Sequence, residues 1–292
     1  MKKLKIFASI MILLTFFLTS CSNPLAESQK KVKLGLVNWV DSISVAYLWK
    51  AILEKKGYKV QMMELDKGAL WTGVARGDVD LTGYVWLPQT DKPYYDKYKE
   101  DVEIGGSWYK GAKLGLVVPS YMKDVNSIED LNKHKDELGG KIYGIDPGSS
   151  LMQLSQQVKQ KYNLNLDLID SSEAAMLTEL NKAYEKKKPI VVTLWNPHWI
   201  FSTEKLKYLK DPKKVYGSTD NIHYMTRKGY HKEHPEIIKM YEKWDMTDEQ
   251  LSKLIKYVNE TTSGDEGYNP QKGVKKWMDE NPDLVKKWMN AK

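Results

Sequence analysis

The stretch Ile-Val-Val-Thr-Leu-Trp-Asn-Pro-His-Trp at positions 190–199 decides how this sequence folds. Its run of β-branched and apolar residues predicts a buried strand. Pro197 cannot continue a central strand, so we expect the strand to end near Trp195, at the start of a loop. The stretch therefore predicts a buried strand that places an indole at its carboxyl end.

Two earlier segments have the same order of residues. Positions 79–88 form a strand-like run that ends in Trp86-Leu-Pro88, and positions 32–38 form another that leads to Trp39. Three predicted strands therefore each end in a tryptophan. If these strands are parallel, their carboxyl ends meet at one edge of a sheet.

Helical segments separate the predicted strands, and the same order occurs in both halves of the chain. The first half predicts strands at 32–38, 58–65 and 79–86, with helices at 42–56 and 67–76. The second half predicts strands at 141–145, 164–169 and 190–194, with helices at 151–161 and 171–187. A β-α-β-α-β order predicts a parallel sheet covered by helices. We therefore expect an α/β fold with two lobes.

Two segments should connect the lobes. The apolar run 114–119 would leave the first lobe, and the segment 215–225 would return to it. Amphipathic helices follow from His234 onward and should pack on the first lobe. Their tryptophans stand at core spacing: Trp244, Trp277 and Trp288. The predicted boundaries are 32–118 and 218–292 for lobe 1, and 119–217 for lobe 2.

The first 31 residues carry export signals. Three lysines precede an apolar run at 6–18, and Leu18-Thr-Ser-Cys21 follows, which matches a secretory signal at positions 1–20. The pattern resembles the lipobox of bacterial lipoproteins, in which cleavage leaves Cys21 as a lipid-modified N-terminus. Residues 21–31 would then form a flexible tether. The alternative is an ordinary secretory signal with an incidental cysteine.

The charge balance does not favour a nucleic-acid partner. The chain has 45 Lys and Arg against 38 Asp and Glu, and removal of the three lysines of the signal leaves 42 against 38, or +4. The lysines alternate with acidic residues, which is typical of a solvated surface. We therefore expect no nucleic-acid binding, and contact with the membrane through the lipid anchor.

Trp39, Trp86 and Trp195 would all stand beyond the carboxyl ends of parallel strands, where such sheets bind ligands. Indole faces attract a quaternary ammonium group. Our hypothesis is an aromatic cage for such a ligand. The alternative is that the three indoles are core residues at strand ends, which their spacing alone does not exclude.

The turn Gly144-Ile145-Asp-Pro-Gly148 stands at a predicted strand-to-helix junction. Backbone N–H groups at the start of a helix bind anions such as a carboxylate. Together, the cage and this turn predict a zwitterionic ligand that carries a trimethylammonium group at one end and a carboxylate at the other.

These segments together resemble the glycine betaine-binding lipoproteins of ABC-type osmoprotectant uptake systems. The resemblance rests on Asn38-Trp-Val-Asp-Ser42, Val85-Trp-Leu-Pro88, Gly111-Ala-Lys-Leu-Gly-Leu-Val-Val-Pro119, Asn126-Ser-Ile-Glu-Asp-Leu131, Gly144-Ile-Asp-Pro-Gly148 and Trp195-Asn-Pro-His-Trp199. It implies a type II periplasmic-binding-protein fold with a ligand cleft between two lobes. It also implies a cage of Trp39, Trp86 and Trp195, and a carboxylate held by the amides of Gly144 and Ile145.

The resemblance further implies a monomer on the extracytoplasmic face of the cell membrane, which delivers its ligand to an ABC permease and its ATPase subunit. One residue departs from the family pattern. Members often have His five residues after the second cage tryptophan, where it helps hold the carboxylate, whereas this chain has Asp91. Asp91 and Asp41 could instead accept a hydrogen bond from the hydroxyl of choline, and the family also covers carnitine and proline betaine.

A catalytic function is not indicated. The sequence has no His-Glu-x-x-His, no Gly-x-Ser-x-Gly and no phosphate-binding Gly-Lys-Ser/Thr. We interpret His231-Lys-Glu-His234 as a solvated helix start and His198 as a loop histidine with satisfied hydrogen bonds. We therefore expect a binding protein that is not an enzyme and has no cofactor or metal. A surface sensor or an adhesin is the alternative from another class.

Overall fold

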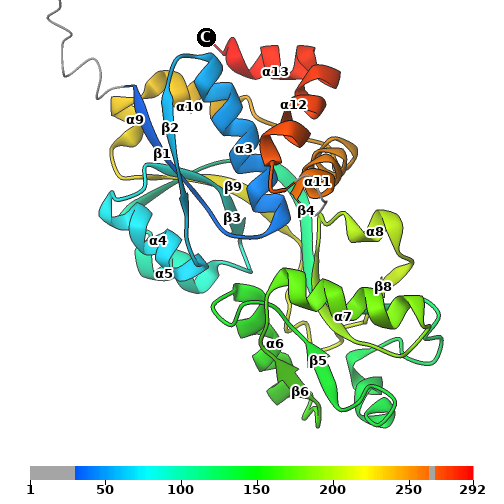
Figure 1. Ribbon diagram of the computed structural model, residues 1–292. Helices are drawn as coiled ribbons and strands as arrows, with labels where there is room; N and C mark the ends of the chain where they lie inside the picture. The colour runs from blue at the N-terminus through cyan, green and yellow to red at the C-terminus, as the bar shows by residue number, and fades with distance from the viewer. Residues whose placement is uncertain (1–29, 263–266, 292) are drawn as a thin grey trace, which may run out of the picture.

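The computed structural model describes residues 30–262 and 267–291 of this chain. The predicted signal, Cys21 and the tether up to residue 29 lie outside the described residues. The described chain forms two α/β lobes, one above the other in Figure 1, and the termini of the described chain lie in the upper lobe. The predicted α/β fold with two lobes is confirmed.

The first lobe begins with three parallel strands. β1 lies between β2 and β3 and pairs in parallel with both. The elements of this segment are β1 (Lys31–Leu36), α3 (Val40–Lys55), β2 (Lys59–Glu64), α4 (Lys67–Arg76), β3 (Leu81–Leu87) and α5 (Lys92–Tyr98). α4 has the predicted bounds because Gly77 adopts a left-handed φ of 79°, which ends the helix.

Two antiparallel strands complete the first sheet, and one of them extends into the second lobe. β9 (Asp220–Arg227) lies between β3 and β4 (Val102–Pro119). Up to Ala112, β4 pairs with β9; from Lys113 onward it pairs with strands of the second lobe. The predicted boundary after residue 118 is therefore wrong, because residues 113–118 belong to the second sheet. The apolar run showed that this strand is buried, but not which strands it pairs with.

The second lobe repeats the order of the first. β5 pairs in parallel with β6 and β7, and β7 pairs antiparallel with β4. The elements of this lobe are η1 (Ile128–His134), a 3₁₀ helix, then β5 (Lys141–Tyr143), α6 (Ser150–Lys161), β6 (Asp167–Ile169), α7 (Glu173–Glu185), β7 (Val192–Asn196), α8 (Ile200–Thr203) and β8 (Leu206–Tyr208).

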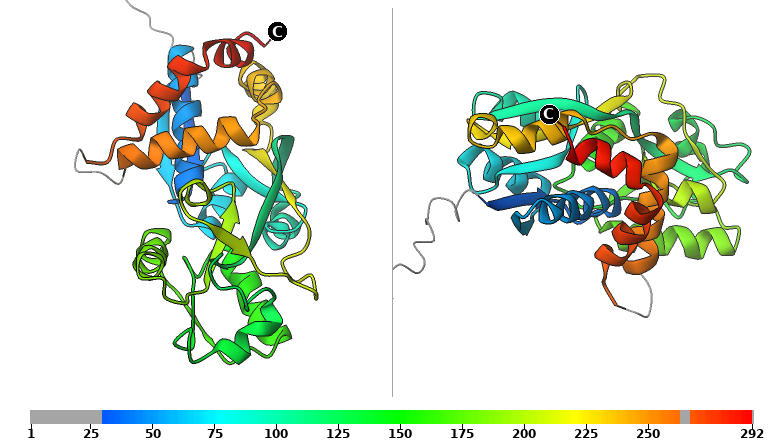
Figure 2. Two further views of the ribbon diagram at one scale, coloured as in Figure 1. Left: turned by 90° about the vertical axis from the view of Figure 1, so that its right-hand side faces the viewer. Right: turned by 90° about the horizontal axis from the view of Figure 1, so that it is seen from above.

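The C-terminal helices pack on the first lobe. They are α9 (Tyr230–Glu233), α10 (Pro235–Glu242), α11 (Asp248–Thr262), α12 (Pro270–Glu280) and α13 (Pro282–Met289). α11 and α12 lie against α3, as both views of Figure 2 show. Trp244, Trp277 and Trp288 are buried, which confirms their predicted core positions. Within residues 30–262 and 267–291, no helix has the length and apolar character needed to cross a bilayer.

Candidate ligand-binding site

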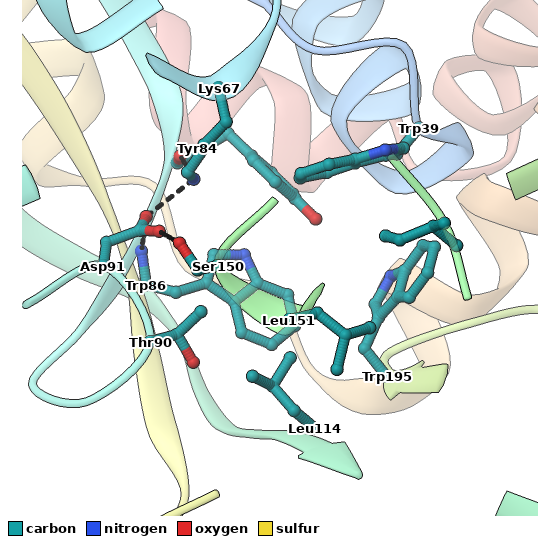
Figure 3. A pocket seen from close by; sticks show the side chains of 11 residues that line it. Trp39, Lys67, Tyr84, Trp86, Thr90, Asp91, Leu114, Ser150, Leu151 and Trp195 are labelled. Carbon is teal, nitrogen blue, oxygen red and sulfur yellow. Dashed lines mark hydrogen bonds and ion pairs between the residues drawn. The ribbon is translucent and has the colours of Figure 1, made fainter. Parts of the chain in front are cut away.

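A cavity lies between the two lobes, at the carboxyl ends of β1 and β3. About 310 Å³ of space that atoms do not fill lies in it, and part of this space is open to solvent. Figure 3 shows Trp39 and Trp195 on one side of this space, and Lys67, Asp91 and Ser150 on the other. The lining residues are Trp39, Lys67, Tyr84, Trp86, Thr90, Asp91, Leu114, Ile145, Ser150, Leu151 and Trp195.

Aromatic rings make up much of the cavity wall. The ring centroid of Trp39 lies 5.9 Å from that of Tyr84 and 6.1 Å from that of Trp195, and the Tyr84 and Trp86 centroids are 5.9 Å apart. The structure thus brings the three predicted tryptophans to one cavity, with Trp195 contributed by the second lobe. Tyr84 adds a fourth ring that we did not predict. The two-residue period of a strand could have identified it, since Tyr84 and Trp86 share one face of β3.

Asp41 stands behind the aromatic wall and does not line the cavity. Its Oδ2 accepts hydrogen bonds from the Tyr84 hydroxyl at 2.6 Å and from the Trp195 indole N–H at 3.1 Å. Among the described residues, Oδ1 has no hydrogen-bond partner. Burial raises the pKa of Asp41 from 3.8 to about 7. Asp41 therefore positions the Tyr84 and Trp195 rings, and its ionisable carboxyl group lies close to them.

Asp91 lines the side of the cavity opposite Trp195 and is fully buried. Its Oδ2 accepts a hydrogen bond from the Trp86 backbone N–H at 2.9 Å and lies 2.6 Å from the Lys67 Nζ. Its Oδ1 accepts a hydrogen bond from the Ser150 hydroxyl at 2.9 Å. Lys67 was not predicted to lie at the site, because the first residue of a helix is a common place for a solvated lysine.

The backbone amides of Gly144 and Ile145 already have acceptors. The Gly144 N–H donates to the Ile169 carbonyl at 2.9 Å, which continues the parallel pairing of β5 with β6. The Ile145 N–H points at the Met152 Sδ at 3.4 Å. The prediction that these two amides hold a carboxylate is therefore wrong, although the Ile145 side chain lines the cavity.

The first turn of α6, unlike Gly144 and Ile145, has backbone N–H donors that could bind a carboxylate. Ser150 and Leu151 both line the cavity, and their backbone N–H groups have no acceptor among the described residues. The first N–H groups of a helix have no partner within the helix. The Ser149 side chain caps the helix by accepting from the Met152 N–H at 3.2 Å, so this donor is already used. The N-cap serine was visible in the sequence and marks this turn.

Hydrogen bonds join the two lobes around the cavity. The Trp39 indole N–H donates to the Asp146 carboxylate at 2.9 Å, and the Val40 backbone N–H donates to the Glu173 carboxylate at 2.9 Å. On the other side, the Tyr94 hydroxyl donates to the Gly148 carbonyl at 2.9 Å. With the bond from Ser150 to Asp91, these contacts hold the lobes in a closed arrangement, in which Trp39 is only 8% exposed.

His198 is a loop histidine with both ring nitrogens engaged, as predicted. Its Nδ1 accepts from the Ile200 backbone N–H at 3.1 Å, so the proton must be on Nε2, which lies 3.1 Å from the Glu173 Oε1. Among the described residues, no group of three or more His, Cys, Asp or Glu side chains is arranged to hold a metal ion.

Residues 30–280 match the model of the family described as the substrate-binding domain of ABC-type glycine betaine transport systems. The chain belongs to this family. The expectations of a binding protein that is not an enzyme, and of the periplasmic-binding-protein fold, are therefore confirmed, and this substrate-binding domain is extracytoplasmic.

Two curated relatives show how far the similarity extends. The glycine betaine/carnitine transport binding protein GbuC of Listeria monocytogenes is 40% identical over 159 residues, which are 53% of this chain and 51% of that protein. The glycine betaine/proline betaine-binding periplasmic protein of Escherichia coli is 27% identical over 54% of this chain and 52% of its own length. The matches thus span about half the length of each relative.

Solved structures match nearly the whole of this chain. Lactococcal OpuAC in its closed-liganded conformation with glycine betaine is 35% identical with a TM-score of 0.82, over 89% of this chain and 100% of that one. A choline-binding protein in complex with choline is 27% identical with a TM-score of 0.83, over 90% of this chain and 92% of that one.

Proposed function

We propose that this protein captures a trimethylated zwitterion, glycine betaine above all, and delivers it to the permease and ATPase subunit of an ABC importer. The observation that carries this proposal is the cavity, which four aromatic rings line and at which the first turn of α6 presents backbone N–H groups with no acceptor among the described residues. The match to OpuAC, which was solved with glycine betaine, supports the same ligand.

The aromatic side suits a quaternary ammonium group. Such a group has no N–H to donate, so ring faces and not hydrogen-bond acceptors recognise it, at about 2 kcal/mol for each desolvated face. The attraction to three or four ring faces offsets a large part of the free-energy cost of association. It is therefore compatible with a micromolar Kd, which corresponds to a binding free energy of about 8 kcal/mol. Asp41, held behind Tyr84 and Trp195, adds a group that can become negative close to the cation.

The other side suits a carboxylate. The N–H groups of Ser150 and Leu151 lie at the N-terminus of a helix of 12 residues, where unpaired donors and the helix dipole both favour an anion. Glycine betaine would place its methyl groups against the rings and its carboxylate against this turn. Because Trp195, Ser150 and Leu151 belong to the second lobe, a ligand that contacts both sides would favour the closed arrangement of the lobes.

Choline is the second candidate, because a carboxylate oxygen of Asp91 lines the cavity where a hydroxyl could donate to it. A choline-binding protein is also among the matching structures. Carnitine and proline betaine share the quaternary ammonium group and complete the set of candidates. For the rest of the protein we propose a monomer that is anchored to the membrane by a lipid on Cys21.

Calorimetric titration of the purified protein with glycine betaine, choline, carnitine and proline betaine tests this function. We expect glycine betaine to bind with a Kd of micromolar order or below, and choline to bind more weakly. Proline, which lacks the quaternary methyl groups, serves as the matched control and should give no heat of binding. The proposal fails if none of the four quaternary ammonium compounds binds.

Proton release on binding is expected from Asp41. Burial raises its pKa to about 7, so at pH 6 the ligand-free protein carries this group mostly as the neutral acid. A quaternary ammonium group nearby favours the carboxylate and lowers that pKa, so binding at pH 6 should release protons, up to about one per ligand. At pH 9 the carboxyl is already ionised, and the release from Asp41 should vanish.

The measurement is calorimetry at pH 6 in buffers that differ in ionisation enthalpy. The apparent binding enthalpy should change linearly with that enthalpy in the wild type, while Asp41→Asn should show a slope near zero and a weaker affinity. A wild-type slope equal to that of Asp41→Asn would contradict the role given to this carboxyl.

A further inference from the structure

Lys67 and Asp91 form an ion pair in the wall of the cavity. The Lys67 Nζ lies 2.6 Å from the Asp91 Oδ2, and the two residues are 4% and 0% exposed. Both line the cavity, and Figure 3 shows the pair on the side opposite Trp195. A buried charge that loses its partner is strongly disfavoured, so each member of this pair depends on the other.

The pair is held from three directions. The Trp86 backbone N–H and the Ser150 hydroxyl both donate to Asp91, and the Tyr84 carbonyl accepts from the Lys67 Nζ at 3.1 Å. An ammonium group has three N–H donors. Among the described residues, Asp91 and the Tyr84 carbonyl accept two of these donors, and the Lys67 Nζ also lies 4.9 Å from the centroid of the Tyr84 ring.

Lys67 also balances the charge at this side of the cavity. Among the described residues that line the cavity, Lys67 is the one Lys or Arg. A carboxylate ligand bound at Ser150 would stand beside Asp91, because the Ser150 hydroxyl donates to Asp91 at 2.9 Å. Two carboxylates at such a distance repel each other unless a cation lies beside them. Lys67 is in that position.

We infer that Lys67 is a specificity-determining residue: by neutralising Asp91 it admits the carboxylate of a zwitterion and disfavours a ligand that carries only a positive charge. This inference rests on the proposed function, because it concerns the opposite end of the same ligand. Asp91 is then the counter-ion of Lys67 and does not repel the ligand. The choice between glycine betaine and choline depends on the balance between these two charges.

Two substitutions shift this balance in opposite directions. Lys67→Met leaves Asp91 unpaired, so glycine betaine should bind at least 100-fold more weakly while choline binds as well as before or better. Asp91→Asn leaves Lys67 unpaired, so choline should bind at least tenfold more weakly while glycine betaine binds as well as before or better. The double variant Lys67→Met/Asp91→Asn removes both charges, and its affinity ratio should lie between those of the two single variants.

The matched control is Lys92→Met. Lys92 and Asp96 form an ion pair with the same distance of 2.6 Å, but their side chains are 60% and 52% exposed and lie outside the cavity. This variant should leave both affinities unchanged. Lys67→Arg keeps the positive charge and should keep the wild-type preference for glycine betaine, so it and the double variant provide the test if Lys67→Met does not fold.

The readout is the ratio of the two dissociation constants, measured by calorimetry with glycine betaine and with choline on each variant that shows a cooperative thermal transition. A purely structural role for Lys67 would weaken both ligands equally and leave the ratio at the wild-type value, which would overturn this inference alone. If the wild type binds neither ligand, the proposed function and the inference fail together. If the wild type prefers choline, the inference fails while a quaternary ammonium function stands.

Discussion

Glycine betaine should bind at least tenfold more weakly when Trp39, Trp86 or Trp195 is replaced by leucine, and about 100-fold or more weakly when two of them are replaced. Leucine keeps much of the apolar area but has no ring quadrupole, so the attraction of the cation to the ring face is lost. A loss of about 1.4 kcal/mol corresponds to a factor of ten in Kd. Replacement by phenylalanine, which keeps a smaller ring, should cost less.

Trp86 offers the cleanest of these tests. Its indole N–H has no hydrogen-bond partner among the described residues, whereas the indoles of Trp39 and Trp195 donate to Asp146 and Asp41. Trp86→Leu thus removes a ring face without breaking a side-chain hydrogen bond. Trp199→Leu is the matched control, since Trp199 does not line the cavity. Unchanged affinity for glycine betaine and for choline in all three single variants would mean that these indoles only fill the core.

Cys21→Ala should move most of the protein from the membrane fraction to the medium or the periplasm. The expectation rests on the sequence alone, because Cys21 lies outside the described residues. The lysines, the apolar run and the motif Leu18-Thr-Ser-Cys21 together predict cleavage before a cysteine that carries the lipid. Lipid chains supply the apolar area that holds such a protein at a bilayer, and no helix within the described residues is long and apolar enough to cross one.

Metabolic labelling with a radioactive fatty acid, followed by fractionation, measures this change. The wild type should incorporate the label and Cys21→Ala should not, while Ser22→Ala, which keeps the cysteine, should behave as the wild type does. A wild-type protein that takes up no label and is released without substitution would point to an ordinary secretory signal.

Much of the fold could be predicted from local patterns. The order of strands and helices, the bounds of α4 and the core positions of Trp244, Trp277 and Trp288 follow from periodicity and from glycine at a helix end, which are properties of neighbouring residues. The point at which β4 changes lobes could not be predicted in this way. A continuous apolar run predicts burial, whereas the choice between β9 and β7 as partner depends on how the two sheets are placed.

In the candidate site, too, local sequence patterns predict some residues, whereas tertiary pairing decides others. Trp39, Trp86 and Trp195 could be predicted to lie together, because each stands at or just beyond the carboxyl end of a strand and these ends meet at the cleft. The motif predicts that Gly144 contacts the ligand, but its N–H donates to the carbonyl of Ile169, a residue of another strand. A motif shows that a turn exists and does not show which of its donors are already used.

By itself, the sequence determined the α/β architecture and the three indoles at strand ends, because each depends on the order of residues along a short segment. The export signal stays a prediction from the sequence. Only the tertiary structure decided that Lys67 pairs with Asp91, that Asp41 stands behind Tyr84 and Trp195, and that the first N–H groups of α6 have no acceptor among the described residues. The physical reason is that a buried charge or N–H group needs a partner inside the fold. Such partners come from strands and lobes that are distant in sequence and meet only when the chain has folded.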